Sequence, residues 1–193
     1  MHIVHYPHPT LRYKSKPVKR VDVELRKVVR QMFDLMYEAN GIGLAANQVD
    51  LPLRLFIVNL AANPDEGEEI VFLNPVVSFP KGSDEADEGC LSLPGVYGPV
   101  VRPARIRVNA YDLSGQEVSA DLEGMQARVV QHELDHLDGV VFPDRMSSTA
   151  RSSVDPLLEE FEADFRTRRE TGEIPDDDEI RRRLAEWEGK YCA

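Results

Sequence analysis

The chain has 193 residues, of which 42% are hydrophobic and 30% are charged, so it is long enough to bury a substantial core as one globular unit. Its 34 acidic and 23 basic residues give a net charge of −11, which argues against a protein that binds by neutralising phosphates, and no nucleic-acid specificity is expected. Because no window resembles a signal peptide or a membrane span and only two cysteines are present, we expect a cytoplasmic protein without membrane contact or a stapling disulfide.

The first two predicted elements are a segment rich in proline and histidine, residues 1–9, and an amphipathic helix. The three histidines of the segment recur every third position, which suits neither a helix nor a strand, so we predict an ordinary surface segment. Apolar residues then recur with helical spacing over residues 25–36. Asp22 is a suitable N-cap for this helix, and Gly41 is a suitable stop.

A small-residue segment and several strands follow. Two glycines and two alanines in residues 41–48 indicate backbone that another group approaches closely, and Gln48 is the long polar side chain there that can donate into a cleft. Residues 54–59 and 70–79 are apolar enough for strands, and a proline in the second predicts an edge or a bulge. The acidic residues 81–87 predict a solvated loop.

A hairpin and a second helix complete the central part of the chain. Alternating apolar and polar residues on both sides of a Gly-containing turn predict a hairpin over residues 104–122. Helical spacing resumes over residues 124–138, with Gly139 as the stop. Four residues of this helix share one face that should lie against the core: Met125, Val129, His132 and His136.

The last part of the chain is acidic, with 8 basic and 13 acidic residues from Arg151 to the end. Asp155 and Pro156 predict the N-cap and first turn of one helix. A final helix is predicted after Pro175, where the acidic run precedes a thin apolar stripe.

The sequence His132-Glu133-Leu134-Asp135-His136 places two imidazoles one helical turn apart, with a glutamate that can reach a water between them. A hydrolytic metal site needs about three protein ligands and an open position, so one ligand is missing. Cys90 is one candidate, because glycine and polar neighbours are unusual around a core cysteine. The alternative third ligand is a downstream carboxylate, as in HExxH metalloendopeptidases: Glu159, Glu160 or Glu162. A structural metal module would instead require a fourth protein ligand.

Three motifs in this order resemble those of the peptide deformylases: Gly41–Gln48, Glu88–Ser92 and His132–His136. The resemblance covers roughly residues 1–165, which we predict as a deformylase-like catalytic domain, with residues 166–193 as an acidic helical extension. It implies an α+β fold, in which antiparallel or mixed β-sheets pack around a central metal-binding helix, with an N-terminal helix and a C-terminal helical extension.

The resemblance also implies a site and a reaction. Cys90, His132 and His136 would bind one divalent metal, Fe²⁺ as in many members, with Zn²⁺, Ni²⁺ or Co²⁺ as alternatives in a purified sample. The reaction would remove the N-formyl group from formyl-methionyl nascent peptides and release formate. Three groups would act in it: Glu133 as general base and acid, the Gln48 amide, and the backbone N–H of Leu91, the latter two on the developing oxyanion.

Further residues are assigned by the same resemblance. The substrate would contact Ile42, Gly43, Gly89 and Val129, and Glu88 would orient a metal ligand. Asp135 would pair with Arg102, although an exposed helix acid is an equally good interpretation of Asp135 alone.

The chain departs from the family pattern in three places. The N-terminal residues Pro7–Arg12 keep only part of the usual opening. Tyr97 stands where many members have arginine, which affects how the substrate backbone is held. The chain beyond about Phe165 has no assigned counterpart, and its acidity excludes the docking of a basic C-terminal helix on the ribosome. Transient contact with the ribosome remains an expected partnership.

Overall fold

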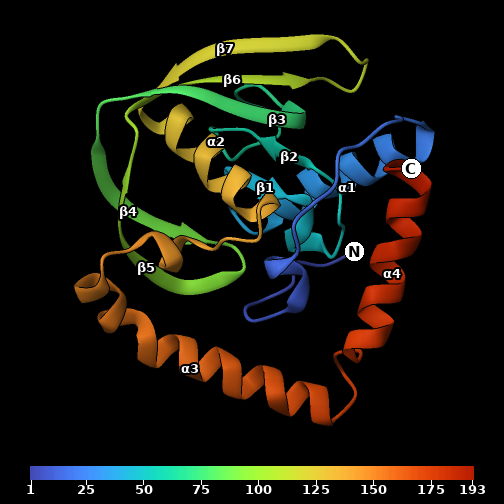
Figure 1. Cartoon of the computed structure of the whole chain (residues 1–193), viewed down its shortest axis with the longest axis vertical. Helices are drawn as coiled ribbons and strands as arrows, with labels where there is room; N and C mark the ends of the chain where they lie inside the picture. The colour runs from blue at the N-terminus through green and yellow to red at the C-terminus, as the bar shows by residue number, and fades with distance from the viewer.

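The computed structural model describes all 193 residues and has an α+β fold (Figure 1). The elements, including three short 3-10 helices labelled η, follow in this order: η1 (Pro9–Arg12), α1 (Val23–Glu38), β1 (Gly43–Ala45), η2 (Ala46–Val49), β2 (Leu55–Val58), β3 (Ile70–Lys81), β4 (Asp84–Cys90), β5 (Leu93–Arg102), β6 (Arg105–Tyr111), β7 (Glu117–Glu123), α2 (Gly124–Leu137), η3 (Phe142–Arg145), α3 (Ser148–Glu170) and α4 (Asp177–Tyr191).

The strands form two antiparallel sheets. One has five strands in the order β1-β2-β3-β6-β7, and the other is the β4–β5 hairpin. The pairing of β3 with β6 shifts register between Leu73 and Val76, so the bulge predicted from the proline there is confirmed. The predicted loop at residues 81–87 is wrong, because most of it forms β4. Charged side chains fit in this strand because its outward face is exposed and its inward Glu88 has buried cationic partners.

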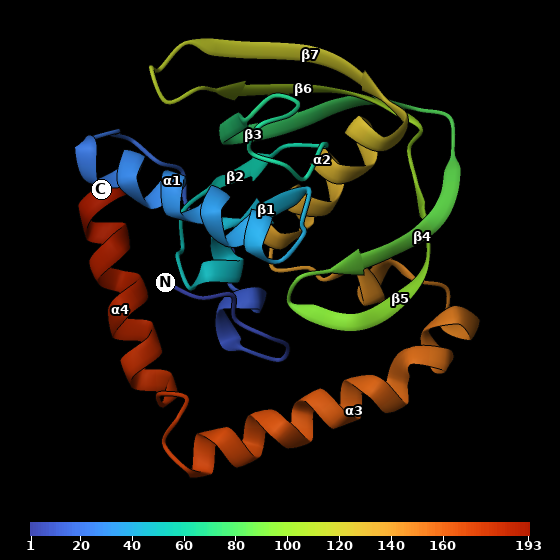
Figure 2. The same ribbon diagram turned by 180° about the vertical axis from the view of Figure 1, so that it is seen from behind.

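Helix α2 lies between the five-stranded sheet and the β4–β5 hairpin (Figures 1 and 2). One side of it packs on the sheet, where Val129 and Val130 join a core with Phe56 and Phe72. The predicted end of this helix is confirmed, since Gly139 follows it with φ 77°. Met125 differs from the prediction, because it is exposed in the first turn of the helix.

The terminal segments pack on the remaining faces. Helix α1 begins after Asp22, whose carboxylate accepts a hydrogen bond from the Leu25 N–H at 2.9 Å, as predicted. The end of α4 returns beside the start of α1 (Figure 2), where Tyr191 is buried and its hydroxyl donates to Asp22 at 3.0 Å. The C-terminal helix is therefore part of the fold. His8 is buried too, so the prediction of a surface segment is wrong at that residue.

Helix α3 begins earlier than predicted. Its N-cap is Ser147, whose hydroxyl accepts a hydrogen bond from the Ala150 N–H at 3.2 Å, and Pro156 lies inside the helix instead of in its first turn. The predicted boundary at residue 165 falls within this helix, and that division into two domains stays a prediction. None of the helices has both the length and the apolar composition that crossing a membrane requires.

Candidate metal centre and substrate cavity

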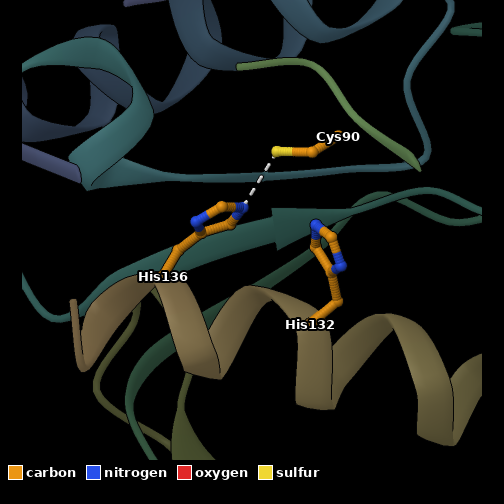
Figure 3. Close-up of side chains that lie close together, drawn as sticks. All are labelled: Cys90, His132 and His136. Carbon is orange, nitrogen blue, oxygen red and sulfur yellow. Dashed lines mark hydrogen bonds between the residues drawn. The ribbon is translucent and has the colours of Figure 1, made fainter. Parts of the chain in front are cut away.

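Cys90, His132 and His136 come together at the end of β4, with donor atoms that all lie within 4.8 Å of one another. Figure 3 shows both imidazoles rising from successive turns of α2 toward the cysteine. The Cys90 Sγ lies 3.2 Å from the His136 Nε2. A shift in the β4–β5 register between Gly89 and Cys90 bends the end of the strand here, as bulges do.

The donor set fits a divalent transition metal. A thiolate and two imidazoles suit zinc or ferrous iron, and three protein ligands leave a position open for water or substrate. No fourth His, Cys, Asp or Glu belongs to the group, which speaks against a closed structural site. The downstream glutamates also lie outside the group, on α3, where Glu162 accepts a hydrogen bond from the Tyr6 hydroxyl at 3.0 Å. The endopeptidase alternative is not favoured.

Glu133 lies beside this group in a buried position on the cavity wall. Its Oε2 is buried and has no hydrogen-bond partner. A Cβ atom at Gly43 would lie 2.5 Å from its Oε1, so only glycine at that position leaves room for the carboxylate. Burial raises the pKa of Glu133 to about 7, against the opposing charges of His132 and Arg102. A carboxyl group with this pKa can both accept and release a proton near neutral pH.

The side chain of Gln48 places its amide nitrogen close to Cys90. The Gln48 Oε1 accepts a hydrogen bond from the Ala45 N–H at 2.9 Å, which fixes the orientation of the side chain. Its Nε2 then lies 3.4 Å from the Cys90 Sγ and 3.2 Å from the Ser92 Oγ. The amide is thus a preoriented donor at the cavity, and Leu91, next to Cys90, lines that cavity as well.

The Glu88 carboxylate contacts the ring of His132, one of the two histidines of the group. Its Oε2 lies 2.9 Å from the His132 Nδ1 and accepts a hydrogen bond from the Arg102 Nη2 at 2.9 Å. Its Oε1 accepts from the Arg102 Nε at 2.6 Å and from the Arg128 Nη1 at 2.7 Å. Burial alone would raise the pKa of Glu88, but hydrogen bonds with Arg102 and His132 hold it well below its usual range.

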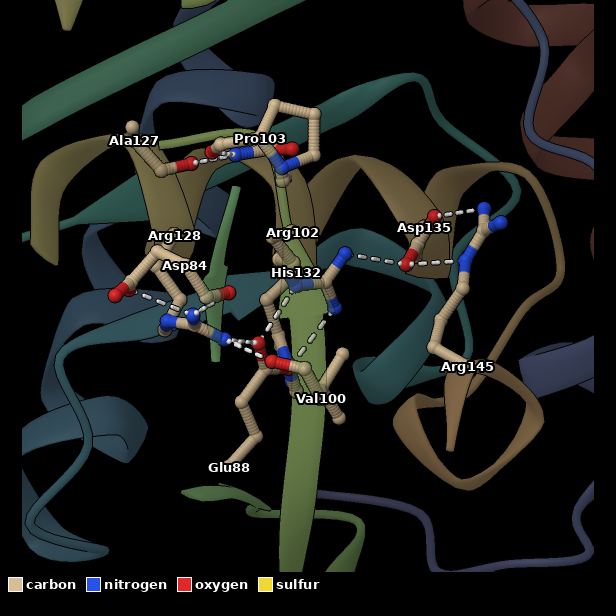
Figure 4. A network of polar contacts seen from close by, with 11 residues as sticks. Asp84, Glu88, Val100, Arg102, Pro103, Ala127, Arg128, His132, Asp135 and Arg145 are labelled. Carbon is tan, nitrogen blue, oxygen red and sulfur yellow. Dashed lines mark hydrogen bonds and ion pairs between the residues drawn. The ribbon is translucent and has the colours of Figure 1, made fainter. Parts of the chain in front are cut away.

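The ion pairs continue along α2 (Figure 4). The predicted pair of Asp135 and Arg102 is confirmed, with 2.8 Å between the Arg102 Nη1 and the Asp135 Oδ2. Arg145 donates to the other oxygen of Asp135 at 2.6 Å, and Arg128 also donates to the carboxylate of Asp84 at 2.9 Å. Sequence reasoning missed both Arg128 and Arg145. Only Arg128 carried a signal, since it precedes His132 by four positions on a predicted helix.

A cavity of about 670 Å³ opens over these groups. All four residues predicted to contact the substrate line it: Ile42, Gly43, Gly89 and Val129. Tyr97 lies at its rim with 68% of the residue exposed. Other predicted site residues contribute from outside the cavity wall: Arg102, Asp135 and His136.

Comparisons with known proteins agree with this geometry. The family model described as polypeptide deformylase matches residues 1–152. A peptide deformylase of Rhodopirellula baltica is 50% identical over 189 residues, which cover 98% of this chain and 94% of that protein. The match includes most of the C-terminal extension, so the expectation that the extension has no family counterpart is wrong.

Plant relatives and a solved structure lead to the same family. The chloroplastic and mitochondrial peptide deformylase 1B of Arabidopsis thaliana is 45% identical over 166 residues, which cover 84% of this chain and 60% of that protein. The crystal structure of a plant peptide deformylase PDF1B superposes with a TM-score of 0.85 at 42% identity, covering 92% of this chain and 95% of that one. The chain described here therefore belongs to the polypeptide deformylase family.

Proposed function

We propose that this protein is a metal-dependent hydrolase that removes the N-formyl group from formyl-methionine at the N-terminus of nascent polypeptides. Water and the formyl amide would yield formate and a peptide with a free amino group. The observation that carries the proposal is the group of Cys90, His132 and His136 beside the buried Glu133, at a cavity whose wall includes Cys90, His132 and Glu133. Membership of the deformylase family supplies the substrate class.

Cys90, His132 and His136 would hold the ion, for which we propose Fe²⁺, with Zn²⁺, Ni²⁺ or Co²⁺ as substitutes. A bound divalent ion supplies Lewis-acid polarisation of the formyl carbonyl and makes a neighbouring water more acidic. Glu133 would take a proton from the attacking water at its unpartnered Oε2 and deliver a proton to the departing amine nitrogen. The Gln48 amide and the Leu91 N–H would donate to the carbonyl oxygen as negative charge develops on it.

The cavity walls would select and orient the peptide. Strand β1 is the free edge of the five-stranded sheet, so backbone groups near Gly43 are available to an extended peptide. Ile42 and Val129 would line the pocket for the methionine side chain. The wall at Gly89 and Cys90 would admit the hydrogen of a formyl group and exclude the methyl of an acetyl group.

Formate release tests the proposal. Protein purified without oxygen and loaded with iron, nickel or cobalt should hydrolyse formyl-Met-Ala-Ser and leave acetyl-Met-Ala-Ser intact. Absence of turnover with all three metals would overturn it. Cys90→Ala should abolish retention of the metal after dialysis, whereas Glu159→Ala should retain it, and the reverse pattern would restore the endopeptidase alternative.

We further propose that the protein acts in the cytoplasm and meets ribosomes only transiently. A thiolate ligand at Cys90 requires a reducing compartment to stay available. The acidic balance of the last 43 residues, with 8 basic against 13 acidic side chains, would repel ribosomal RNA. Cosedimentation with ribosomes should therefore be weak already at low salt, where this repulsion is least screened.

A further inference from the structure

The Gln48 amide is carried by a very short element. Helix η2 has only four residues, Ala46–Val49, and a 3-10 helix of this length has few hydrogen bonds of its own. It ends at Asp50, whose backbone is left-handed with φ 62°, a conformation that few residues other than glycine, asparagine and aspartate adopt readily. The position of the amide therefore depends on the contacts that hold η2 from outside.

The N-terminal segment holds one part of η2. The Val4 N–H donates a hydrogen bond to the Gln48 carbonyl oxygen at 2.8 Å. The side-chain nitrogen of Asn47 donates to the carbonyl oxygens of Thr10 at 3.2 Å and Tyr13 at 2.7 Å. These contacts act on Asn47 and Gln48, and the end of η2 beyond them is held through Asp50.

The Asp50 carboxylate joins the end of η2 to two other elements. Its Oδ1 accepts a hydrogen bond from the Thr10 hydroxyl of η1 at 2.5 Å, and its Oδ2 lies 2.6 Å from the Arg183 Nη2 of α4. Only 16% of the Asp50 side chain is exposed, so the carboxylate depends on a cationic partner. The His8 Nδ1 lies 4.0 Å away, but burial lowers the pKa of His8 to about 4 and leaves its ring neutral at pH 7. Arg183 is therefore the cation that compensates Asp50.

Helix α4 turns one of its three consecutive arginines toward Asp50. The helix lies beside the N-terminal segment (Figure 2), where the Tyr13 hydroxyl donates to the Glu188 carboxylate at 2.5 Å. Arg183 is half-buried and reaches Asp50, whereas Arg182 is exposed and forms no ion pair. The contact between α4 and the end of η2 thus rests on a single guanidinium.

We propose that Asp50 and Arg183 are positioning residues for the Gln48 amide, and that the C-terminal helix thereby supports the oxyanion donor of the active site. The ion pair would keep Asp50 in its left-handed conformation and hold the end of η2 where the Gln48 Nε2 lies at the cavity. Neither residue lines the cavity or belongs to the group of Cys90, His132 and His136, so their effect passes through Gln48. This inference rests on the proposed deformylase function.

The expected effect of breaking the ion pair is a lower kcat at an unchanged KM. Complete removal of an oxyanion donor costs roughly 10²–10³ in kcat, and a displaced donor loses part of that, so we expect a fall of about tenfold for Arg183→Ala. KM should stay within about twofold of the parent value, because a contact with developing charge acts mainly on the transition state.

A double-mutant cycle in the nickel-loaded protein tests the assignment, with kcat and KM measured as formate release from formyl-Met-Ala-Ser. Arg183→Ala and Asp50→Asn should each lower kcat about tenfold. Asp50→Asn keeps an acceptor for Thr10 and a residue that tolerates the left-handed backbone. Arg183→Lys keeps the cation and should retain most of the activity, and Arg182→Ala is the matched control, which should equal the parent. In a Gln48→Ala background, Arg183→Ala should change kcat by less than about twofold.

A second readout does not depend on turnover. In the zinc-loaded protein, Arg183→Ala and Asp50→Asn should shift or broaden the side-chain NH₂ signals of Gln48 in a ¹⁵N-resolved NMR spectrum. They should also speed hydrogen exchange at the Ala45 N–H, which donates to the Gln48 Oε1. Arg182→Ala should leave both observations unchanged.

Two results would overturn the inference. One is a parent-like kcat with parent-like Gln48 signals in both Arg183→Ala and Asp50→Asn. The other is an equal loss of kcat with and without the Gln48 amide, which would assign the loss to the fold in general. If the parent protein hydrolyses no formyl-Met-Ala-Ser, the proposed function fails, and the Gln48 signals and the exchange of the Ala45 N–H then decide the positioning by themselves.

Discussion

Replacing Glu88 with glutamine removes one charge and one acceptor from the group that holds His132. Both carboxylate oxygens of Glu88 are filled by donors, with two partners on each oxygen at 2.6–2.9 Å. A glutamine keeps one oxygen and places an NH₂ group where the other stood. In either orientation that NH₂ group faces an N–H of Arg102, which has no acceptor to offer, and the second group it faces is either Arg128 or the ring nitrogen of His132.

The substitution should lower both the affinity for the metal and the free energy of unfolding. If the NH₂ group faces His132, it favours the tautomer whose proton sits on Nε2, the nitrogen that would face the ion. Metal affinity should then fall by about 10- to 100-fold, the usual effect of losing such a supporting contact. The loss of charge also leaves the buried Arg102 and Arg128 undercompensated, so the free energy of unfolding should fall by about 3–5 kcal/mol.

Chelator competition and urea denaturation measure the two effects separately. Glu85→Gln is the matched control, since Glu85 lies on the same strand but is exposed and forms no ion pair. It should change neither metal affinity nor stability beyond about 0.5 kcal/mol. The reasoning is refuted if Glu88→Gln binds metal as tightly as the parent protein and unfolds at the same urea concentration.

Three further predictions concern single groups. Glu133→Gln should retain the metal but lower kcat by about 10²- to 10⁴-fold, measured as formate release, because the Oε2 proton acceptor is lost. The iron form should lose activity in air while a nickel-loaded control keeps it, because Cys90 oxidises beside ferrous iron, and equal decay of both forms would contradict this. Burial, with the charges of Arg183 and Arg169 against that of Asp50, lowers the pKa of His8 to about 4. In the unfolded chain His8 has a pKa near 6.5, so it takes up a proton there at a higher pH than in the folded protein. The free energy of unfolding should therefore be at its full value above about pH 6.5 and fall by about 3 kcal/mol as the pH decreases to 4. In urea titrations across this range, His8→Gln should lose this component of the pH dependence, and an unchanged slope would contradict the assignment.

The metal-binding helix could be predicted because everything that defines it is local. The spacing of His132 and His136, the cap at the helix end and the apolar stripe all lie within one short segment. Cys90 could be named only by its neighbours and by family resemblance. No local pattern specifies which strand end will reach a helix so far along the chain.

Strand β4 was missed because its stability is not local. Its acidic residues are typical of a solvated loop, and they become a strand only when β5 pairs with them and Arg102 of β5 and Arg128 of α2 meet Glu88. The start of α3 was misplaced for a related reason. Pro156 is typical of a first turn, whereas the Ser147 cap and the packing of Val154 and Leu158 extend the helix to both sides of it.

The buried ion pairs explain how a ligand from the hairpin meets two ligands from the helix. Such pairs add little net stability compared with apolar packing, so their contribution here is directional. Glu88 and Arg102 belong to the hairpin, and Arg128 and Asp135 belong to α2. The hydrogen bonds among them therefore fix the position of the hairpin along the axis of the helix. Apolar contacts alone are not directional and would allow the hairpin to slide. With the network in place, the end of β4 can deliver Cys90 only at the level of the two histidines, and the chemistry depends on that alignment.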